Sequence, residues 1–372
     1  MAIVLLRFVI NLKDHRDTGF FGGNGPLFHR WLPNGEKDAI MLETGDENVE
    51  LKIWFERLGY LDGSFIKFDK MRHEVEPEIM DKQGMLEAGP LQGSLKIGGI
   101  ADQELQSMRK FKLGVEKYKV FGKKVIKLIY PSVSTFIDIL RTNYGQYWIP
   151  PLGKWDSTEQ SIGSYCLHLH LTWSLDEGKS WLDFNPDKPI GELRTTLTLG
   201  PMPKFQEYLT REDWQELAGV IGSSYQPDLV ARLTAHVHRL LDEGNIKYAL
   251  IEGVTALEVT IEDFVRRKLG KDDILSGPTN RFLDLPLPSQ IVALGSALTD
   301  TIPIENIEGT VSAIISRNSV VHDGEEPTGD AEKYIRGLLN TLAALLPGPR
   351  LKFPESPSGN VSSPPEKWEQ RY

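Results

Sequence analysis

The sequence is poor in cysteine, in long apolar runs and in surplus positive charge. Cys166 is the only cysteine in 372 residues, which excludes an intrachain disulfide framework and suits a reducing compartment. The early apolar stretch from Ala2 to Leu6 is short and ends at Arg7, so it predicts neither a signal peptide nor a membrane span. These absences predict a cytoplasmic protein that does not contact the membrane.

Acidic residues outnumber basic ones, so the formal net charge is -10. Proteins that coat nucleic acid generically neutralise phosphates with surplus lysine and arginine, so any contact with RNA must be local here. Hydrophobic residues make up 40% and charged residues 25% of the chain, as in an average folded protein. The length exceeds one ordinary core, and we therefore expect two domains.

Residues 1–222 are expected to form a β-rich N-terminal domain that recognises a trigger or a partner. Short segments rich in β-formers alternate there with glycine and proline, and Leu61-Asp62-Gly63 is typical of a hairpin turn. Asp176-Glu177-Gly178 predicts a second turn. The strands are expected at 48–57, 64–68, 124–130 and 165–175, and one helix at 132–148, where Pro150-Pro151 ends it.

Residues 227–348 have the periodicity of helices, which predicts an all-α, up-down bundle and an α+β protein as a whole. Gly244, Gly270 and Gly324 stand where helices are expected to end. The tail at 349–372 is dense in proline, serine and glycine and is expected to be disordered. The helices are expected at 227–241, 245–269, 289–299, 303–322 and 328–346.

The helix at 303–322 carries the candidate site. Val311, Ile315, Asn318 and His322 are spaced by four, three and four residues, so one side of a regular helix passes from apolar to polar. Arg317 adjoins this stripe and can reach the same opening. Buried polar groups need partners or a cleft, so a cation, an amide and an imidazole are expected to converge there.

These side chains suit cleavage of RNA. Histidine can accept the proton of a ribose 2′-hydroxyl or donate one to the leaving oxygen, and arginine can stabilise the charge on the phosphate. The 2′-hydroxyl is an internal nucleophile, so this chemistry requires no metal and no cofactor and yields a 2′,3′-cyclic phosphate. We therefore expect catalytic roles for Arg317, Asn318 and His322.

The segment Arg317-Asn318-Ser-Val-Val-His322 resembles the R-x4-6-H signature of HEPN domains, including those of abortive-infection proteins. Glu258, in Ala256-Leu257-Glu258, matches an acidic residue that these domains often place near the Arg/His pair. The resemblance covers about 120 residues. It implies a helical bundle, a homodimer formed through the helical domain, and RNA cutting as a toxin or antiphage effector, with Glu258 supporting Arg317 or His322.

Other readings of these residues stay open. The three polar residues also fit an ordinary helix C-terminus, and Glu258 fits an exposed charge beside a stripe. A HEPN-like protein that only dimerises or binds a nucleotide is the alternative function. Gly19 to Pro26 fits a loop better than a phosphate-binding loop, because the Gly-Lys-Ser/Thr ending is missing.

Several lysines and histidines are further candidates for binding RNA or a metal. A lysine-rich segment with interleaved aromatics could hold RNA, although alternating lysines also protect an exposed pair of strands. Cys166, His168 and His170 share one face of an expected strand, but the spacing suggests no fourth ligand, and we expect no metal. His236 and His238 are expected at the surface. The candidate RNA-binding lysines are Lys110, Lys112, Lys117, Lys119, Lys123 and Lys124.

Overall fold

A computed structural model of the chain divides it into two compact units. The first comprises Met1–Arg141 and Trp148–Pro227, and the second comprises Thr142–Tyr147 and Asp228–Tyr372. The division after Pro227 lies beside the boundary expected between residues 222 and 227. The structure describes residues 2–10, 25–29, 31–55, 58–61, 64–67, 85–109, 116–149, 151–152, 170–184, 209–221, 227–269 and 273–346.

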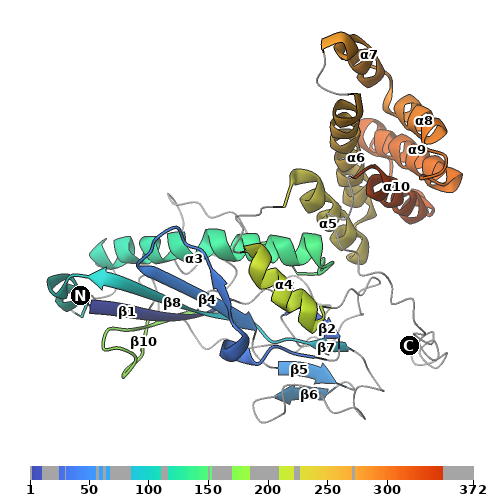
Figure 1. Cartoon of the computed structure of the whole chain (residues 1–372). Helices are drawn as coiled ribbons and strands as arrows, with labels where there is room; N and C mark the ends of the chain where they lie inside the picture. The colour runs from blue at the N-terminus through green and yellow to red at the C-terminus, as the bar shows by residue number, and fades with distance from the viewer. Residues whose placement is uncertain are drawn as a thin grey trace. The chain divides into compact units, whose positions relative to one another are not determined.

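The N-terminal unit is built on an antiparallel sheet of six strands (Figure 1). Its strand order is β10-β9-β1-β8-β4-β3, with β1 pairing to β8 and β9 on its two sides. Alternate residues of β1 are buried, as expected for a sheet covered on one face. The strands are β1 (Ala2–Ile10), β3 (Ile40–Leu42), β4 (Val49–Phe55), β8 (Leu91–Ile100), β9 (His170–Ser174) and β10 (Leu182–Asp183).

Two smaller two-stranded sheets complete the strands that the structure describes. The pair β5–β6 joins Leu61 to Ser64 at its closed end, at the hairpin that the sequence predicts. The predicted turn at Asp176-Glu177-Gly178 is also present, with positive φ at Glu177 and Gly178. These strands are β2 (Leu27–His29), β5 (Leu58–Leu61), β6 (Ser64–Lys67) and β7 (Met85–Glu87), and η1 (Gly35–Asp38) is a short 3-10 helix.

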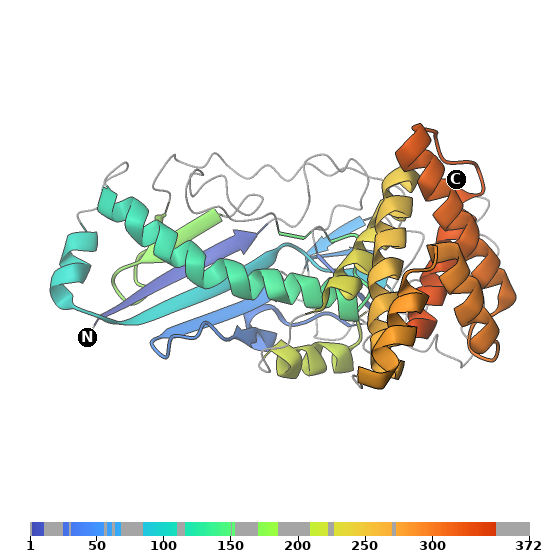
Figure 2. The ribbon, with the colours of Figure 1, turned by 90° about the horizontal axis from the view of Figure 1, so that it is seen from above.

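Helix α3 (Glu116–Asn143) runs along one face of the six-stranded sheet (Figure 2). Phe136 of this helix contacts Phe55 of β4, with 6.0 Å between ring centroids, and Phe121 lies 6.0 Å from Trp173 of β9. Trp214 of α4 (Arg211–Ile221) joins the same aromatic cluster, with its ring centroid 5.9 Å from that of Phe55. The core of the first unit therefore lies between the sheet, α3 and α4; a short helix, α2 (Asp102–Met108), follows β8.

The strand expected at 124–130 is wrong, because these residues belong to α3. The helix expected at 132–148 begins earlier, at Glu116, continues through Pro131 and ends at Asn143. The β-branched residues gave a strand-like pattern, but burial decided the conformation. The buried side chains recur every three or four residues along one side of a helix, at Phe121, Val125, Ile129, Val133, Phe136 and Leu140.

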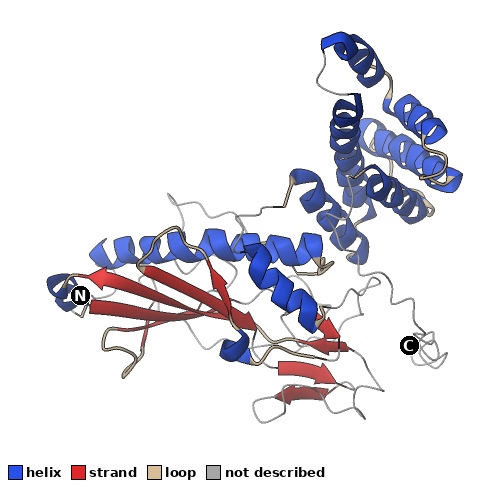
Figure 3. Cartoon of the chain, in the orientation of Figure 1, coloured by secondary structure: helices blue, strands red, loops and turns tan. Residues whose placement is uncertain are grey.

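The second unit contains helices, whereas every strand that the structure describes lies in the first (Figure 3). Asp228 caps α5 by accepting a hydrogen bond of 2.8 Å from the amide of Ala231. The helices are α5 (Leu229–Asp242), α6 (Ile246–Leu269), α7 (Asp273–Leu283), α8 (Leu287–Ala297), α9 (Ile304–Asn318) with the π-helical turn η3 (Ser319–Asp323), and α10 (Ala331–Leu345).

A continuous hydrophobic core joins most of these helices. It includes Leu250 and Leu257 of α6, Ile314 of α9 and Leu338 of α10. Helices α9 and α10 approach closely at Gly309 and Gly337, where a Cβ on Gly337 would lie 3.1 Å from the Cα of Gly309. The hydroxyls of Thr310 and Thr341 bond across this crossing at 2.9 Å. Small residues thus fix the position of α9.

Helices α2, α4 and α7 were not predicted. The signal for α4 is a capping box, because Thr210 and Asp213 exchange hydrogen bonds of 2.8 and 3.1 Å. Helix α7 contains Gly277 and Pro278, which weaken its helical pattern. None of the helices that the structure describes is long and apolar enough to span a membrane.

Candidate functional site

Helix α9 changes its winding at the motif. Regular α-helix ends at Asn318, and Ser319–Asp323 form a π-helical turn that Gly324 closes with a φ of 70°. Val320 is buried in the core of the second unit and holds the turn against it. His322 therefore does not continue the regular helix that the sequence predicts. Turns of this kind occur frequently at functional sites, because they redirect side chains at a helix end.

The residues of the motif differ in exposure. Arg317 is half-buried, and its Nη1 donates a hydrogen bond of 3.1 Å to Oδ1 of Asn318. Its Nε lies buried and has no hydrogen-bond partner among the described residues. Asn318 and His322 are exposed. The motif thus presents an amide and an imidazole to solvent beside a guanidinium that retains an unused donor.

The apolar part of the expected stripe faces outward. The side chain of Ile315 is 56% exposed, and Val311 is only partly buried. The core side of α9 is formed instead by Ile307, Thr310 and Ile314. The sequence could not decide which of two apolar sides of α9 the other helices cover.

Glu258 lies apart from the motif. It follows Lys247 by eleven residues in α6, which is about 16 Å along the helix axis. Lys247 is the residue of α6 that reaches the segment after His322, with 3.5 Å between its Nζ and Oε1 of Glu326. Glu258 instead lines a cavity of about 450 Å³ between α6, α7 and α8, and none of the three motif residues lines it.

The cavity beside Glu258 is polar. Gln290 supports its wall, because its Nε2 donates to the carbonyls of Leu283 and Leu285 at 3.0 and 2.8 Å. Arg266 is paired with Glu262 at 3.0 Å. Within the described parts of the chain, no group of three histidine, cysteine or acidic side chains is arranged to hold a metal ion.

His238 is only partly exposed, and its Nδ1 is shielded from solvent. Its ring stacks on Tyr147, with centroids 4.3 Å apart and planes 8° apart. Burial, and then the nearby charge of Arg336, lowers the pKa of His238 to about 4. His238 is therefore a neutral structural residue at pH 7. The sequence placed both histidines correctly on α5 but could not show which neighbours would cover one of them.

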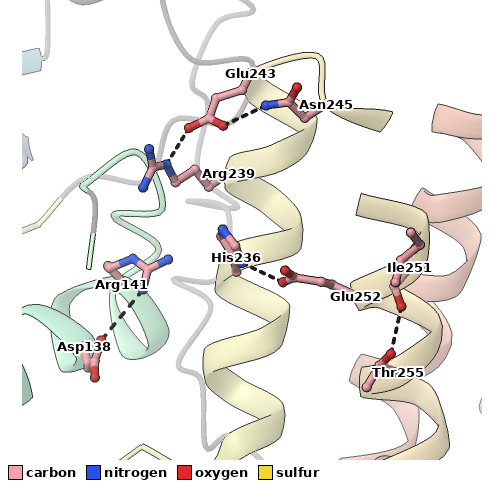
Figure 4. Close-up of polar contacts among 9 residues, drawn as sticks. All are labelled: Asp138, Arg141, His236, Arg239, Glu243, Asn245, Ile251, Glu252 and Thr255. Carbon is pink, nitrogen blue, oxygen red and sulfur yellow. Dashed lines mark hydrogen bonds and ion pairs between the residues drawn. The ribbon is translucent and has the colours of Figure 1, made fainter. Parts of the chain in front are cut away.

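His236 is partly exposed, as expected, but it has a partner that the sequence analysis missed. Its Nδ1 lies 2.6 Å from Oε2 of Glu252 on α6 (Figure 4). On the same side of α5, Arg239 bonds Glu243, which accepts a hydrogen bond from Asn245 (Figure 4). Carboxylates thus partner both His236 and Arg239. Helices α5 and α6 are consecutive, so an antiparallel pairing of the two could have suggested the contact.

The candidate RNA-binding lysines fall on α3 or outside the described residues. Lys123 and Lys124 are exposed on α3, so they do not belong to the pair of strands that we expected. Lys117 and Lys119 belong to the first turns of the same helix, whereas Lys110 and Lys112 lie outside the described residues. The lysines at 117–124 therefore follow a helix, where consecutive residues point in different directions.

Several other expectations concern segments that the structure does not describe. Cys166, His168 and most of the glycine-rich segment at 19–26 are among them, as is the tail at 349–372. His170 begins β9, but its side chain is also outside the description. These expectations stay predictions.

A shallow apolar groove runs between α8 and the N-terminal half of α9. It has a volume of about 430 Å³, and Val292, Ile304 and Val311 contribute to its lining. The side chain of Ile304 is 64% exposed. The groove and Ile315 together extend the exposed apolar side of α9 toward the motif.

No known protein-family model matches the chain, and neither a curated protein nor a solved structure is detectably similar to it.

Proposed function

We propose that this protein is a metal-independent endoribonuclease of the HEPN type, acting in the cytoplasm as an effector of antiphage defence. In this proposal the helices α5–α10 are a HEPN-like, up-down bundle. The N-terminal unit responds to a trigger or partner and controls the nuclease. His322 is the proton-transfer group, Arg317 stabilises the phosphate, and Asn318 orients its neighbour.

The observation that carries the proposal is the unused donor of Arg317. A buried N–H without a partner costs about 1 to 3 kcal/mol, and a fold seldom retains such a group without a use for it. A bound phosphate oxygen would accept from the guanidinium and offset this cost. The π-helical turn meanwhile keeps the imidazole of His322 in solvent, where it can exchange protons.

The reaction follows from these groups. A base removes the proton of the ribose 2′-hydroxyl, and the 2′-oxygen then attacks the adjacent phosphorus. The bond from phosphorus to the 5′-oxygen breaks, and the 5′-oxygen gains a proton. The products are a 2′,3′-cyclic phosphate and a free 5′-hydroxyl. His322 serves one of the two proton transfers, and Arg317 stabilises the added negative charge on the phosphoryl oxygens.

A homodimer is part of the proposal. Exposed apolar residues follow α9 from Ile304 to Ile315 and lead to the motif, and a second copy of the chain could cover them. Such contact would bring two motifs to one interface. Glu258 is retained only as a residue of the polar cavity, because it lies about 16 Å along α6 from Lys247, which pairs with Glu326.

The same apolar side of α9 favours the second candidate function. A HEPN-like protein that only dimerises, or holds a nucleotide, would need the exposed residues of α9 but not the imidazole of His322. The two functions differ in what substitution of the motif does to RNA.

The test uses single substitutions in the full chain, with cleavage of single-stranded RNA as the measurement. We expect His322→Ala to lower the cleavage rate by about 10² to 10⁴-fold, and Arg317→Ala by about 10² to 10³-fold. Arg267→Ala is the matched control, because Arg267 is also an arginine in a helix but is not part of the motif. Its Nε lies 2.8 Å from Oδ2 of Asp263. Equal cleavage by all four proteins would overturn the catalytic assignment and favour the binding function.

A further inference from the structure

An exposed tyrosine stands at the N-terminal end of α6. The side chain of Tyr248 is 60% exposed, while the next two residues, Ala249 and Leu250, are fully buried in the core. The ring of Tyr248 therefore contributes little to the packing of the second unit. Among the described residues with large, exposed apolar side chains, Tyr248 is the aromatic one. Its ring is therefore accessible to a ligand.

The neighbouring lysine connects this end of α6 to the motif. Nζ of Lys247 lies 3.5 Å from Oε1 of Glu326, four residues after His322. The intervening chain turns at Gly324, and the amide of Glu325 returns to the carbonyl of Ser319 at 3.3 Å. The segment after His322 is thus held compactly. The N-terminal end of α6 and the motif therefore lie at the same end of the second unit.

The ion pair between Lys247 and Glu326 is exposed and weak. The two side chains are 37% and 81% exposed, and pairs of this kind contribute little to stability. A phosphate can replace the carboxylate of Glu326 on the lysine, because both are anions that accept hydrogen bonds. In the free protein Glu326 thus pairs with the ammonium group of Lys247 but holds it only weakly.

We propose that Lys247 and Tyr248 form a subsite that holds single-stranded RNA beside the motif. The lysine binds a backbone phosphate after displacing Glu326, and one base stacks on the tyrosine ring. Unpaired bases are needed for stacking, so the subsite selects single strands over duplexes. The inference rests on the proposed function for the identity of its ligand, but it does not require that the RNA is cut.

The experiment measures binding of a short, fluorescently labelled single-stranded RNA of mixed sequence by anisotropy. The full chain carries His322→Ala throughout, so that cleavage does not disturb the equilibrium. We expect Tyr248→Leu to weaken binding about tenfold, whereas Tyr248→Phe keeps the stacking ring and binds within about twofold of the parent. Circular dichroism spectra check that each variant is folded.

Two charge variants test the role of the lysine. Lys247→Gln should weaken binding and reduce its dependence on salt, because one phosphate contact is lost. Glu326→Gln should strengthen binding about twofold to threefold, since the lysine is then free, an effect that a purely structural ion pair would not give. Lys268→Gln is the matched control at the other end of α6 and should leave binding unchanged.

The outcomes separate this inference from the proposed function. Cleavage by the unsubstituted chain together with unchanged binding by Tyr248→Leu would overturn the subsite alone. Binding that depends on Tyr248 without any cleavage would support the subsite and overturn the nuclease. Equal losses for Tyr248→Leu and Tyr248→Phe would exclude stacking, and no RNA binding by the parent would overturn both.

Discussion

Helices α3 and α9 differ in how far the rest of the protein covers their apolar side chains. Every apolar position on the sheet side of α3, from Phe121 to Leu140, is buried within the first unit. In α9 a second apolar side stays uncovered, with Ile304 and Ile315 more than half exposed. The first helix is a core element, and its sequence is explained by packing. The second has more apolar surface than its own unit can cover, which is the condition for an interface.

The two helices also end differently. Helix α3 ends near Tyr147, whose ring stacks on the neutral, partly exposed His238. Helix α9 ends in a π-helical turn with an exposed histidine and an arginine that has an unused donor. In the first case a ring of the protein covers the imidazole, and in the second the imidazole is exposed to solvent. That difference is what makes the end of α9 the better candidate site.

The same substitution in both helices should have very different costs. Ile137 of α3 is fully buried, so Ile137→Ala should lower the free energy of unfolding by about 2 to 5 kcal/mol. Ile315→Ala should change it by less than about 0.5 kcal/mol, because that side chain is mostly in solvent. Urea denaturation followed by circular dichroism, at low protein concentration, measures both. Equal costs would remove the distinction between the two helices.

The stacked histidine, His238, should make the protein less stable in weak acid. Because the pKa of His238 is lowered to about 4 from 6.5, the unfolded chain binds the proton more readily than the folded one. The contribution of His238 to the free energy of unfolding is fully present above about pH 6.5. It is lost as the pH falls from 6.5 toward 4, and the loss is about 3 kcal/mol. His238→Phe keeps a ring against Tyr147 but cannot bind a proton.

The difference between the parent and His238→Phe isolates this residue from the other titrating groups. Urea denaturation at several values between pH 7 and pH 4 should show a shallower loss for the variant. Identical pH profiles for the two proteins would mean that His238 titrates normally and is not shielded by Tyr147 and its neighbours.

The exposed side of α9 should control association. Ile315→Lys places a charge in the proposed interface and should raise the dissociation constant of the dimer by about tenfold or more. Val120→Lys, at another exposed apolar residue on α3, is the matched control and should have no effect. Sedimentation velocity over a range of concentrations measures both. A monomeric parent, or a dimer that resists Ile315→Lys, contradicts the proposed interface.

The sequence predicted the parts of the fold that depend on neighbouring residues. The helices α5 and α6 begin and end within about two residues of the expected positions, because Asp228 caps the first and Gly244 with a positive φ separates them. The strands β5 and β6 pair where the sequence predicts a hairpin. Helix α3 was partly misassigned, because its β-branched residues favour a strand until the sheet covers them.

The candidate site was predicted in identity but not in environment. The spacing of Arg317, Asn318 and His322 was read from the chain, and its meaning as a nuclease stays a prediction. The sequence does not encode locally that α9 would wind into a π turn at Ser319, or that Arg317 would keep a buried donor without a partner. Contacts such as His236 with Glu252 join different helices and have no local signal.

By itself, the sequence determined where the polypeptide alternates between strand-forming and helix-forming segments, and it marked one helix end as chemically unusual. Only the tertiary structure decided which apolar side of α9 is covered, that His238 stacks on Tyr147, and that Glu258 belongs to a cavity with α7 and α8. The physical reason is that caps, turns and periodicity act between residues close in the chain. Burial depends instead on which elements, distant in the sequence, pack against each face of a helix or sheet.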